Sequence, residues 1–316
     1  MQRLHRRKLG HLTLAVAGAL VGFRPPPAGA AALLGPRQSD SVPLRYVLPL
    51  DNNPTADNVW AHLAPSTDSD IVAYIPYGTP VGVLRQASGE QLDFGDGIWW
   101  EVRLPYGAGW VYSALLGDTP RGAPAPPLPP PVPEPPYAPD PVGPGRSIVV
   151  DRDAQFLWAY DGTKPVLSVG CSTGGASLPT PIGEFAVTGH FHPHLFLSLW
   201  KEGSPYYYAP TEATFALRFL GADFYLHDAP WRHVFGPDSQ GGEGMPGDDT
   251  TGSHGCVNLP YPAARFLYNW AADGTPVRVV GLPDSSKLAA LPPPMFPVTS
   301  PLPKPSLTSG PASVQS

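Results

Sequence analysis

The chain contains 316 residues, carries a formal net charge of −6, and includes 45 prolines and 34 glycines. This proportion approaches that of low-complexity chains, but 42% hydrophobic and 10% aromatic residues exclude a chain that is disordered throughout. The acidic balance excludes nucleic acid as the expected partner, because phosphate binding requires a basic surface. The prolines cluster at 25–27, 120–144 and 283–311, which leaves two blocks, 41–118 and 146–282, long enough to bury a core each.

Residues 1–30 have the pattern of a secretory signal peptide. A basic segment, Arg3–Lys8, precedes an apolar run, Leu9–Phe23, and a small-residue cleavage site at Ala28-Gly29-Ala30. The apolar run is shorter than the ~20 residues that span a bilayer, so no stable membrane span is expected, although an uncleaved anchor stays an alternative. We therefore expect a secreted, extracytoplasmic protein.

Short β-rich runs separated by glycine and proline turns follow one another through residues 41–118. Runs of this length and spacing are typical of a small barrel. In so small a barrel most aromatic residues belong to the core, so we expect Trp99, Trp100 and Trp110 to be core residues rather than the lining of a ligand groove. The expected strands are Ile71–Ile75, Val81–Leu84, Trp99–Leu104 and Trp110–Tyr112.

Four segments of this block carry a resemblance to a known family. They are Pro65-Ser66-Thr67, Ile75–Val81, Trp100-Glu101-Val102 and Gly109-Trp110-Val111. Together they resemble the bacterial SH3-like (SH3b) domain over about sixty residues. The resemblance implies a non-catalytic module that contacts the cell wall.

The two proline-rich segments are predicted to lack regular structure. Residues 119–145 are about half proline, so they favour polyproline II, a semi-rigid spacer that holds the two blocks apart. The tail 283–316 is rich in proline, serine and threonine and is expected to be disordered.

The block 146–282 is predicted to be mostly β, with one short helix. The helix is expected from Tyr261 to Ala272, because an apolar face runs along it and Asp273-Gly274 ends it. The expected strands are Ile148–Val150, Phe156–Tyr160, Val166–Val169, Phe215–Phe219, Phe224–His227 and Val277–Val280.

Cys256 is the candidate nucleophile of this block. A thiol attacks as its thiolate, and a nearby imidazole or a helix N-terminus lowers its pKa. Cys256 directly precedes the expected helix, and His227 ends an expected strand that could lie beside it. Gly255 allows backbone N–H groups to approach a developing oxyanion. The alternative is a disulfide between Cys171 and Cys256, which the expected export favours.

Three motifs of the second block occur in an informative order. They are Ser172-Thr173-Gly174 with Thr180-Pro181-Ile182-Gly183-Glu184-Phe185, then Tyr225-Leu226-His227-Asp228, then Ser253-His254-Gly255-Cys256-Val257-Asn258. In this order they resemble the L,D-transpeptidase catalytic domain of the YkuD type, over residues 146–281. The resemblance implies a β-sandwich-like domain and a cysteine acyltransferase.

The resemblance also implies a role for each motif residue. Cys256 would be the nucleophile and His227 its base, with the carbonyl group of Asp228 orienting the imidazole. His254 and Gly255, together with the amide of Cys256, would shape the oxyanion region. The residues that would support the site and the substrate are Ser253, Asn258 and Tyr225.

Several other features allow two interpretations. The 25 residues between His227 and Ser253 make a longer gap than the family usually shows, and the Gly-rich insertion 236–252 is either a lid or a passive loop. His233 is the alternative base, but His227 is preferred because it follows a strand. Three alternating histidines could share a strand face, yet a proline interrupts them and no carboxylate or cysteine accompanies them, so no metal site is expected there. The sequence implies no cofactor. These histidines are His190, His192 and His194.

The expected function is a peptidoglycan L,D-transpeptidase that forms 3→3 cross-links through a thioester on Cys256. Its partners would be peptidoglycan stem peptides, with the SH3-like domain on the cell wall. Two alternatives stay open: an L,D-carboxypeptidase that trims stem tetrapeptides with water, and a non-catalytic cell-wall-binding protein with a disulfide.

Overall fold

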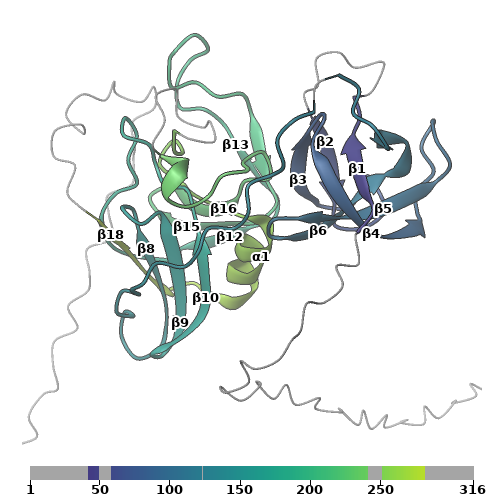
Figure 1. The fold of residues 1–316 in the computed structure, drawn as a ribbon. Coiled ribbons are helices and arrows are strands. Elements are labelled where there is room, and N and C mark those ends of the chain that lie inside the picture. The colour runs from purple at the N-terminus through teal and green to yellow at the C-terminus, as the bar shows by residue number, and fades with distance from the viewer. Residues whose placement is uncertain (1–41, 50–57, 123, 241–250, 282–316) are drawn as a thin grey trace, which may run out of the picture. The chain divides into compact units, whose positions relative to one another are not determined.

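The computed structural model describes residues 42–49, 58–122, 124–240 and 251–281 (Figure 1). The predicted signal peptide and tail, and residues 241–250 of the Gly-rich insertion, lie outside the described residues. The described residues from Val42 onward belong to one compact unit. Within these ranges no helix is both long and apolar enough to cross a membrane.

The described residues of the first block form a seven-stranded sheet in the order β3-β2-β6-β5-β4-β1-β7, with antiparallel pairing throughout. All four expected strands are present. The structure adds the short strands β1, β2 and β7, whose sequences lack a distinctive pattern. The elements are β1 (Leu44–Val47), β2 (Asn58–His62), β3 (Ile71–Pro76), β4 (Pro80–Ser88), β5 (Ile98–Leu104), β6 (Gly107–Tyr112), η1 (Ser113–Leu115) and β7 (Leu116–Gly117).

Aromatic residues account for much of the core of this block. Trp99 and Trp110 are buried and pack with Tyr112 in one cluster, which confirms the prediction that they are core residues. Trp100 is half-buried and carries the guanidinium of Arg45 over its ring, 5.0 Å from the ring centroid. Trp60 on β2, by contrast, leaves 51% of its surface exposed.

The described part of the second block contains three sheets and one α-helix. A five-stranded sheet has the order β10-β9-β8-β18-β11, a four-stranded sheet the order β12-β15-β16-β17, and β13 pairs with β14. All six expected strands and the helix are present. The elements are β8 (Arg146–Asp151), β9 (Phe156–Asp161), β10 (Lys164–Gly170), β11 (Gly183–Ala186), β12 (Gly189–Phe191), β13 (His194–Phe196), β14 (Thr211–Ala213), β15 (Ala216–Leu220), β16 (Phe224–Asp228), η2 (Pro237–Ser239), β17 (Val257–Leu259), α1 (Tyr261–Trp270) and β18 (Pro276–Val280).

One hydrophobic core joins the two larger sheets of this block. It combines Ile148 and Leu157 of the five-stranded sheet with Leu217 and Leu226 of the four-stranded sheet, and Leu267 adds the apolar face of α1. Burial of these side chains is the main force that holds the two sheets face to face. The mainly β, sandwich-like fold with one short helix is therefore confirmed.

The proline-rich segment does not hold the two blocks apart, so that expectation was wrong. The segment lies along the second block: Glu134 accepts a hydrogen bond from the indole of Trp158 (2.9 Å), and the carbonyl of Pro139 accepts one from the hydroxyl of Tyr160 (2.7 Å). The blocks also meet directly, since the hydroxyl of Tyr261 donates to the carboxylate of Asp70 (2.7 Å). Polyproline composition sets local stiffness, whereas these aromatic donors decide where the segment lies.

Candidate active site

The parallel pairing of β16 with β17 brings the two main motifs together. Leu226 lies opposite Val257, and His227 lies opposite Asn258. Successive side chains of a strand point to opposite faces. Leu226 and Val257 accordingly enter the core, while His227 and Asn258 face a cavity of about 450 Å³. Cys256, one position before β17, lines the same cavity.

The imidazole of His227 is held in one orientation. Its Nδ1 donates a hydrogen bond to the backbone carbonyl of Asp228 at 2.7 Å. The ring also lies 4.6 Å from that of Phe196 and 6.1 Å from that of Trp231, measured between centroids. Burial lowers the pKa of His227 to about 4, with a smaller opposing effect from the bond to Asp228. At neutral pH the ring is therefore uncharged, and Nε2 carries the free lone pair.

The carboxylate of Asp228 has a structural task. It is fully buried and accepts hydrogen bonds from the backbone N–H groups of Phe215 (2.6 Å) and Thr214 (3.2 Å). Burial raises its pKa to about 6, although these bonds act in the opposite direction. The side chain thus fixes the end of β16 against β15, while the carbonyl group of the same residue orients the imidazole.

The thiol of Cys256 is largely enclosed. It donates a hydrogen bond to the carbonyl of Asp223 at 3.5 Å. Burial raises the pKa of Cys256 to about 12; a hydrogen bond with the backbone of Tyr225 lowers it, and the charge of Asp223 raises it further. These directions favour a neutral thiol and a neutral imidazole in the shared cavity over an ion pair.

The helix dipole does not act on Cys256 as the sequence predicted. The three residues of β17 and Pro260 separate the cysteine from α1, so the thiol is not at the helix N-terminus. A strand of three residues carries too little periodicity to be recognised from sequence. The expected lowering of the thiol pKa by the helix is therefore wrong.

A serine closes the turn that presents the cysteine. The hydroxyl of Ser253 donates to the carbonyl of Cys256 and accepts from the N–H of Gly255 (3.0 Å). Gly255 adopts φ +118°, and a Cβ there would lie 2.9 Å from the ring of Phe224. Both the positive φ and the close approach require glycine. Because the Gly255 amide already has an acceptor, the Cys256 amide is the better candidate for an oxyanion donor.

The first motif supports this turn from behind. Backbone bridges pair Ser172 with Asn258 and Gly174 with Ser253. The hydroxyl of the buried Thr180 donates to the carbonyl of Gly255 (2.7 Å) and accepts from the N–H of Gly174 (2.8 Å). Thr180 belongs to the first motif, and its role in supporting the turn follows from these two hydrogen bonds.

Aromatic side chains form much of the remaining cleft lining, and sequence reasoning did not assign them to the site. Tyr208 packs on the ring of His254, 4.7 Å between centroids. Burial lowers the pKa of His254 to about 4, so that ring is also neutral at pH 7. Tyr225 contacts the ring of His194 (4.7 Å) and donates to the carbonyl of Ala222, and it does not line the cavity. The lining residues beyond the motifs are Tyr74, Phe196, Tyr207, Tyr208, Pro210, Thr211, Glu212 and Trp231.

Two family models match the chain. Residues 145–279 match the L,D-transpeptidase catalytic domain, and residues 62–117 match the bacterial SH3 domain. Residues 145–279 form an L,D-transpeptidase catalytic domain of the YkuD type.

Solved structures of L,D-transpeptidases are similar to part of the chain. A mutant of the Enterococcus faecium enzyme is 27% identical, with 43% of this chain and 50% of that chain covered and a TM-score of 0.36. L,D-transpeptidase 1 of Mycobacterium tuberculosis is 24% identical (43% and 62% covered, TM-score 0.35), and the Mycobacterium smegmatis enzyme is 19% identical (62% and 81% covered, TM-score 0.36). The chain thus spans about half the length of the first of these structures. No curated protein matches the chain.

His233 and Cys171, the other two residues considered for the chemistry, lie outside the cleft lining. His233 donates from Nε2 to the carbonyl of Tyr74 (2.7 Å) and does not line the cleft, which argues against it as the base. Both cysteines are free thiols, and Cys171 is fully buried in the core, where burial raises its pKa. The catalytic roles of His227 and Cys256 stay predictions that their positions support.

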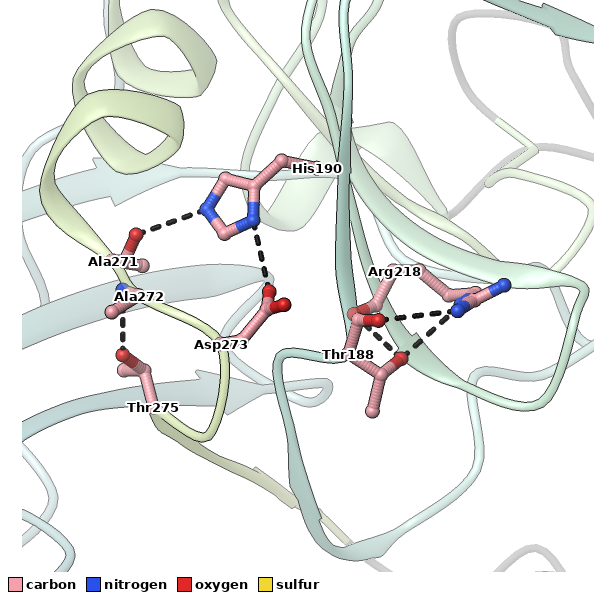
Figure 2. Close-up of polar contacts among 7 residues, drawn as sticks. All are labelled: Thr188, His190, Arg218, Ala271, Ala272, Asp273 and Thr275. Carbon is pink, nitrogen blue, oxygen red and sulfur yellow. Dashed lines mark hydrogen bonds and ion pairs between the residues drawn. The ribbon is translucent and has the colours of Figure 1, made fainter.

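The three alternating histidines have separate structural partners. His190 bonds the carboxylate of Asp273 and the carbonyl of Ala271, each at 3.0 Å, and so ties β12 to the end of α1 (Figure 2). His192 donates to the carbonyl of Thr214 (2.7 Å), and His194 packs among aromatic rings. Across the described residues, no group of three or more His, Cys, Asp or Glu side chains could hold a metal ion.

Proposed function

We propose that the protein is a peptidoglycan L,D-transpeptidase that forms 3→3 cross-links through a thioester on Cys256. The observation that carries this proposal is the position of the Cys256 thiol and the His227 imidazole on one face of the β16–β17 pair, lining one cavity. A half-buried thiol that shares a cavity with an oriented, neutral imidazole is suited to acyl transfer. The match of residues 145–279 to the L,D-transpeptidase catalytic domain supports the same reaction class.

In the proposed first step, the sulfur of Cys256 attacks the carbonyl carbon of the third residue of a stem tetrapeptide. Because the resting thiol is neutral, Nε2 of His227 takes its proton as the S–C bond forms. The bond from Nδ1 to the Asp228 carbonyl becomes stronger as the imidazolium forms, so it stabilises that charge.

The tetrahedral intermediate then collapses to a thioester. The C–N bond to the terminal D-alanine breaks, and the imidazolium returns its proton to the leaving amine. The amide of Cys256 and the side chain of His254 are the proposed oxyanion donors. The amine of a second stem peptide next attacks the thioester carbon, gives its proton to His227 and releases the thiol with a new amide cross-link.

The proposed location of this reaction is the cell wall outside the cytoplasm. The predicted signal peptide supports export, and the bacterial SH3 domain at 62–117 is the proposed wall-binding module. Export and wall binding are measured together by fractionating cells that express the full chain.

Mass spectrometry of the full chain with a disaccharide-tetrapeptide tests the proposed chemistry. The expected product is a cross-linked dimer that lacks one D-alanine, together with an acyl-enzyme mass adduct on Cys256. Cys256→Ala is expected to remove both. A tripeptide product alone would indicate hydrolysis by water, as in an L,D-carboxypeptidase. No adduct and no product with a folded, reduced enzyme would reject the catalytic proposal.

A further inference from the structure

An edge strand of the SH3 domain is bound to the segment that follows His227. Within the seven-stranded sheet β3 pairs with β2 on one side and is the last strand on the other. On this outer side the N–H of Tyr74 donates to the carbonyl of Pro230 (2.8 Å), and the carbonyl of Tyr74 accepts from Nε2 of His233 (2.7 Å). These two bonds pair the outward-facing N–H and carbonyl groups of the edge strand at Tyr74, and they fix its backbone beside the catalytic domain.

The side chain of Tyr74 enters the lining of the active-site cleft. It lines the same cavity as His227, Trp231 and Cys256. The SH3 domain therefore supplies part of the cleft wall, although it contributes no motif residue. Tyr74 is also within electrostatic reach of Asp228 and Glu212, which confirms its closeness to the end of β16 and to β14.

A second aromatic residue extends this wall outward. Trp60 of β2 is the register partner of Tyr74, and their rings are stacked with centroids 5.7 Å apart and an interplanar angle of 21°. Trp60 is 51% exposed, whereas Tyr74 is half-buried. The two rings thus form a continuous aromatic surface that runs from the cleft lining to solvent.

We propose that Tyr74 and Trp60 bind the sugar portion of the peptidoglycan donor while its stem peptide reaches Cys256. This inference rests on the proposed function and assigns a specificity role to the SH3 domain within the active site. The SH3 domain would then form part of the donor site in addition to binding the cell wall.

The chemistry of the donor matches this surface. A pyranose ring has a face of C–H groups that packs on the electron-rich face of an aromatic ring, while its hydroxyl groups stay in water. Three residues separate the reacting carbonyl from the sugar, and when extended they span about 10–11 Å. The sugar would therefore lie away from the thiol, near the rim of the cleft, where the exposed Trp60 extends the wall.

Substrate pairs that differ in the sugar test the proposal. Initial rates of the full chain are measured with a disaccharide-tetrapeptide donor and with the free tetrapeptide. Tyr74→Leu and Trp60→Leu remove an aromatic face and keep the backbone hydrogen bonds. Trp60→Leu is expected to lower kcat/KM for the disaccharide substrate about tenfold through KM, and to change kcat/KM for the free tetrapeptide by less than about twofold. Tyr74→Leu changes a residue that lines the cleft, so it is expected to lower kcat/KM for both substrates, and to lower it more for the disaccharide substrate. Phe94→Leu, an exposed aromatic of the same domain outside the cleft lining, is the matched control.

The outcomes separate this inference from the proposed function. An equal loss on both substrates would overturn the sugar assignment, and so would unchanged rates on both. Binding to the inactive Cys256→Ala full chain is measured in parallel by calorimetry. If the wild type shows no turnover, weaker binding of the disaccharide-tetrapeptide after Trp60→Leu, without weaker binding of the tetrapeptide, still supports the aromatic wall. Equal affinities in that assay reject it.

Discussion

Replacement of Thr180 by valine should destabilise the turn that presents Cys256. The Thr180 hydroxyl joins the carbonyl of Gly255 (2.7 Å) to the N–H of Gly174 (2.8 Å), and Thr180 is fully buried. Valine has nearly the same shape but leaves both backbone groups without this partner. A buried, unsatisfied polar group costs about 1–3 kcal/mol, so the two together predict a loss of roughly 2–6 kcal/mol in unfolding free energy.

Urea denaturation of the full chain, followed by tryptophan fluorescence, measures this loss. Thr180→Ser is the matched control, since it retains the hydroxyl and removes one buried methyl group, worth about 1 kcal/mol. In steady-state assays the valine variant is expected to show a lower kcat and a smaller change in KM, because the Gly255 carbonyl adjoins the nucleophile. Equal stability and equal kcat in the serine and valine variants would refute the proposed bridging role.

Three further results are expected. Because burial lowers the pKa of His227 to about 4, kcat/KM should stay constant as pH falls from 7 to about 5, and then drop tenfold per unit below pH 4 as the base becomes protonated; an inflection near 6.5 would contradict this. Because the pKa of Cys256 is raised to about 12, iodoacetamide should alkylate it more slowly at pH 8 than it alkylates free cysteine, and the alkylation rate should rise with pH. An alkylation rate that does not change between pH 6 and 9 would instead indicate a thiolate–imidazolium pair. Gly255→Ala places a Cβ at a positive φ and 2.9 Å from the ring of Phe224, so it should lower the free energy of unfolding by about 1–3 kcal/mol or more. Gly203→Ala is the control, because Gly203 has φ +90° and open space around it, so this variant measures the backbone strain alone. Equal thermal shifts in the two variants would rule out the Phe224 clash.

Local sequence patterns were sufficient for the main elements of both blocks. The strands β3, β5, β9 and β16 follow β-rich runs bounded by turn residues, and α1 follows a helical apolar face. These patterns depend on neighbours in the chain, so they can be recognised without the fold. Short strands such as β17 escaped recognition because three residues define no period, and that omission led to the wrong prediction about the helix dipole.

The sequence by itself determined the candidate nucleophile, the candidate base and the family of the catalytic domain, because each rests on a contiguous motif around Cys256 or His227. Tertiary structure decided everything that depends on burial and on contacts between distant segments. The neutral thiol and imidazole result from enclosure of the cleft, which no local pattern reports. The entry of Tyr74 into the cleft depends on hydrogen bonds to Pro230 and His233, more than 150 residues away in the chain, so it appears once the two domains are packed together.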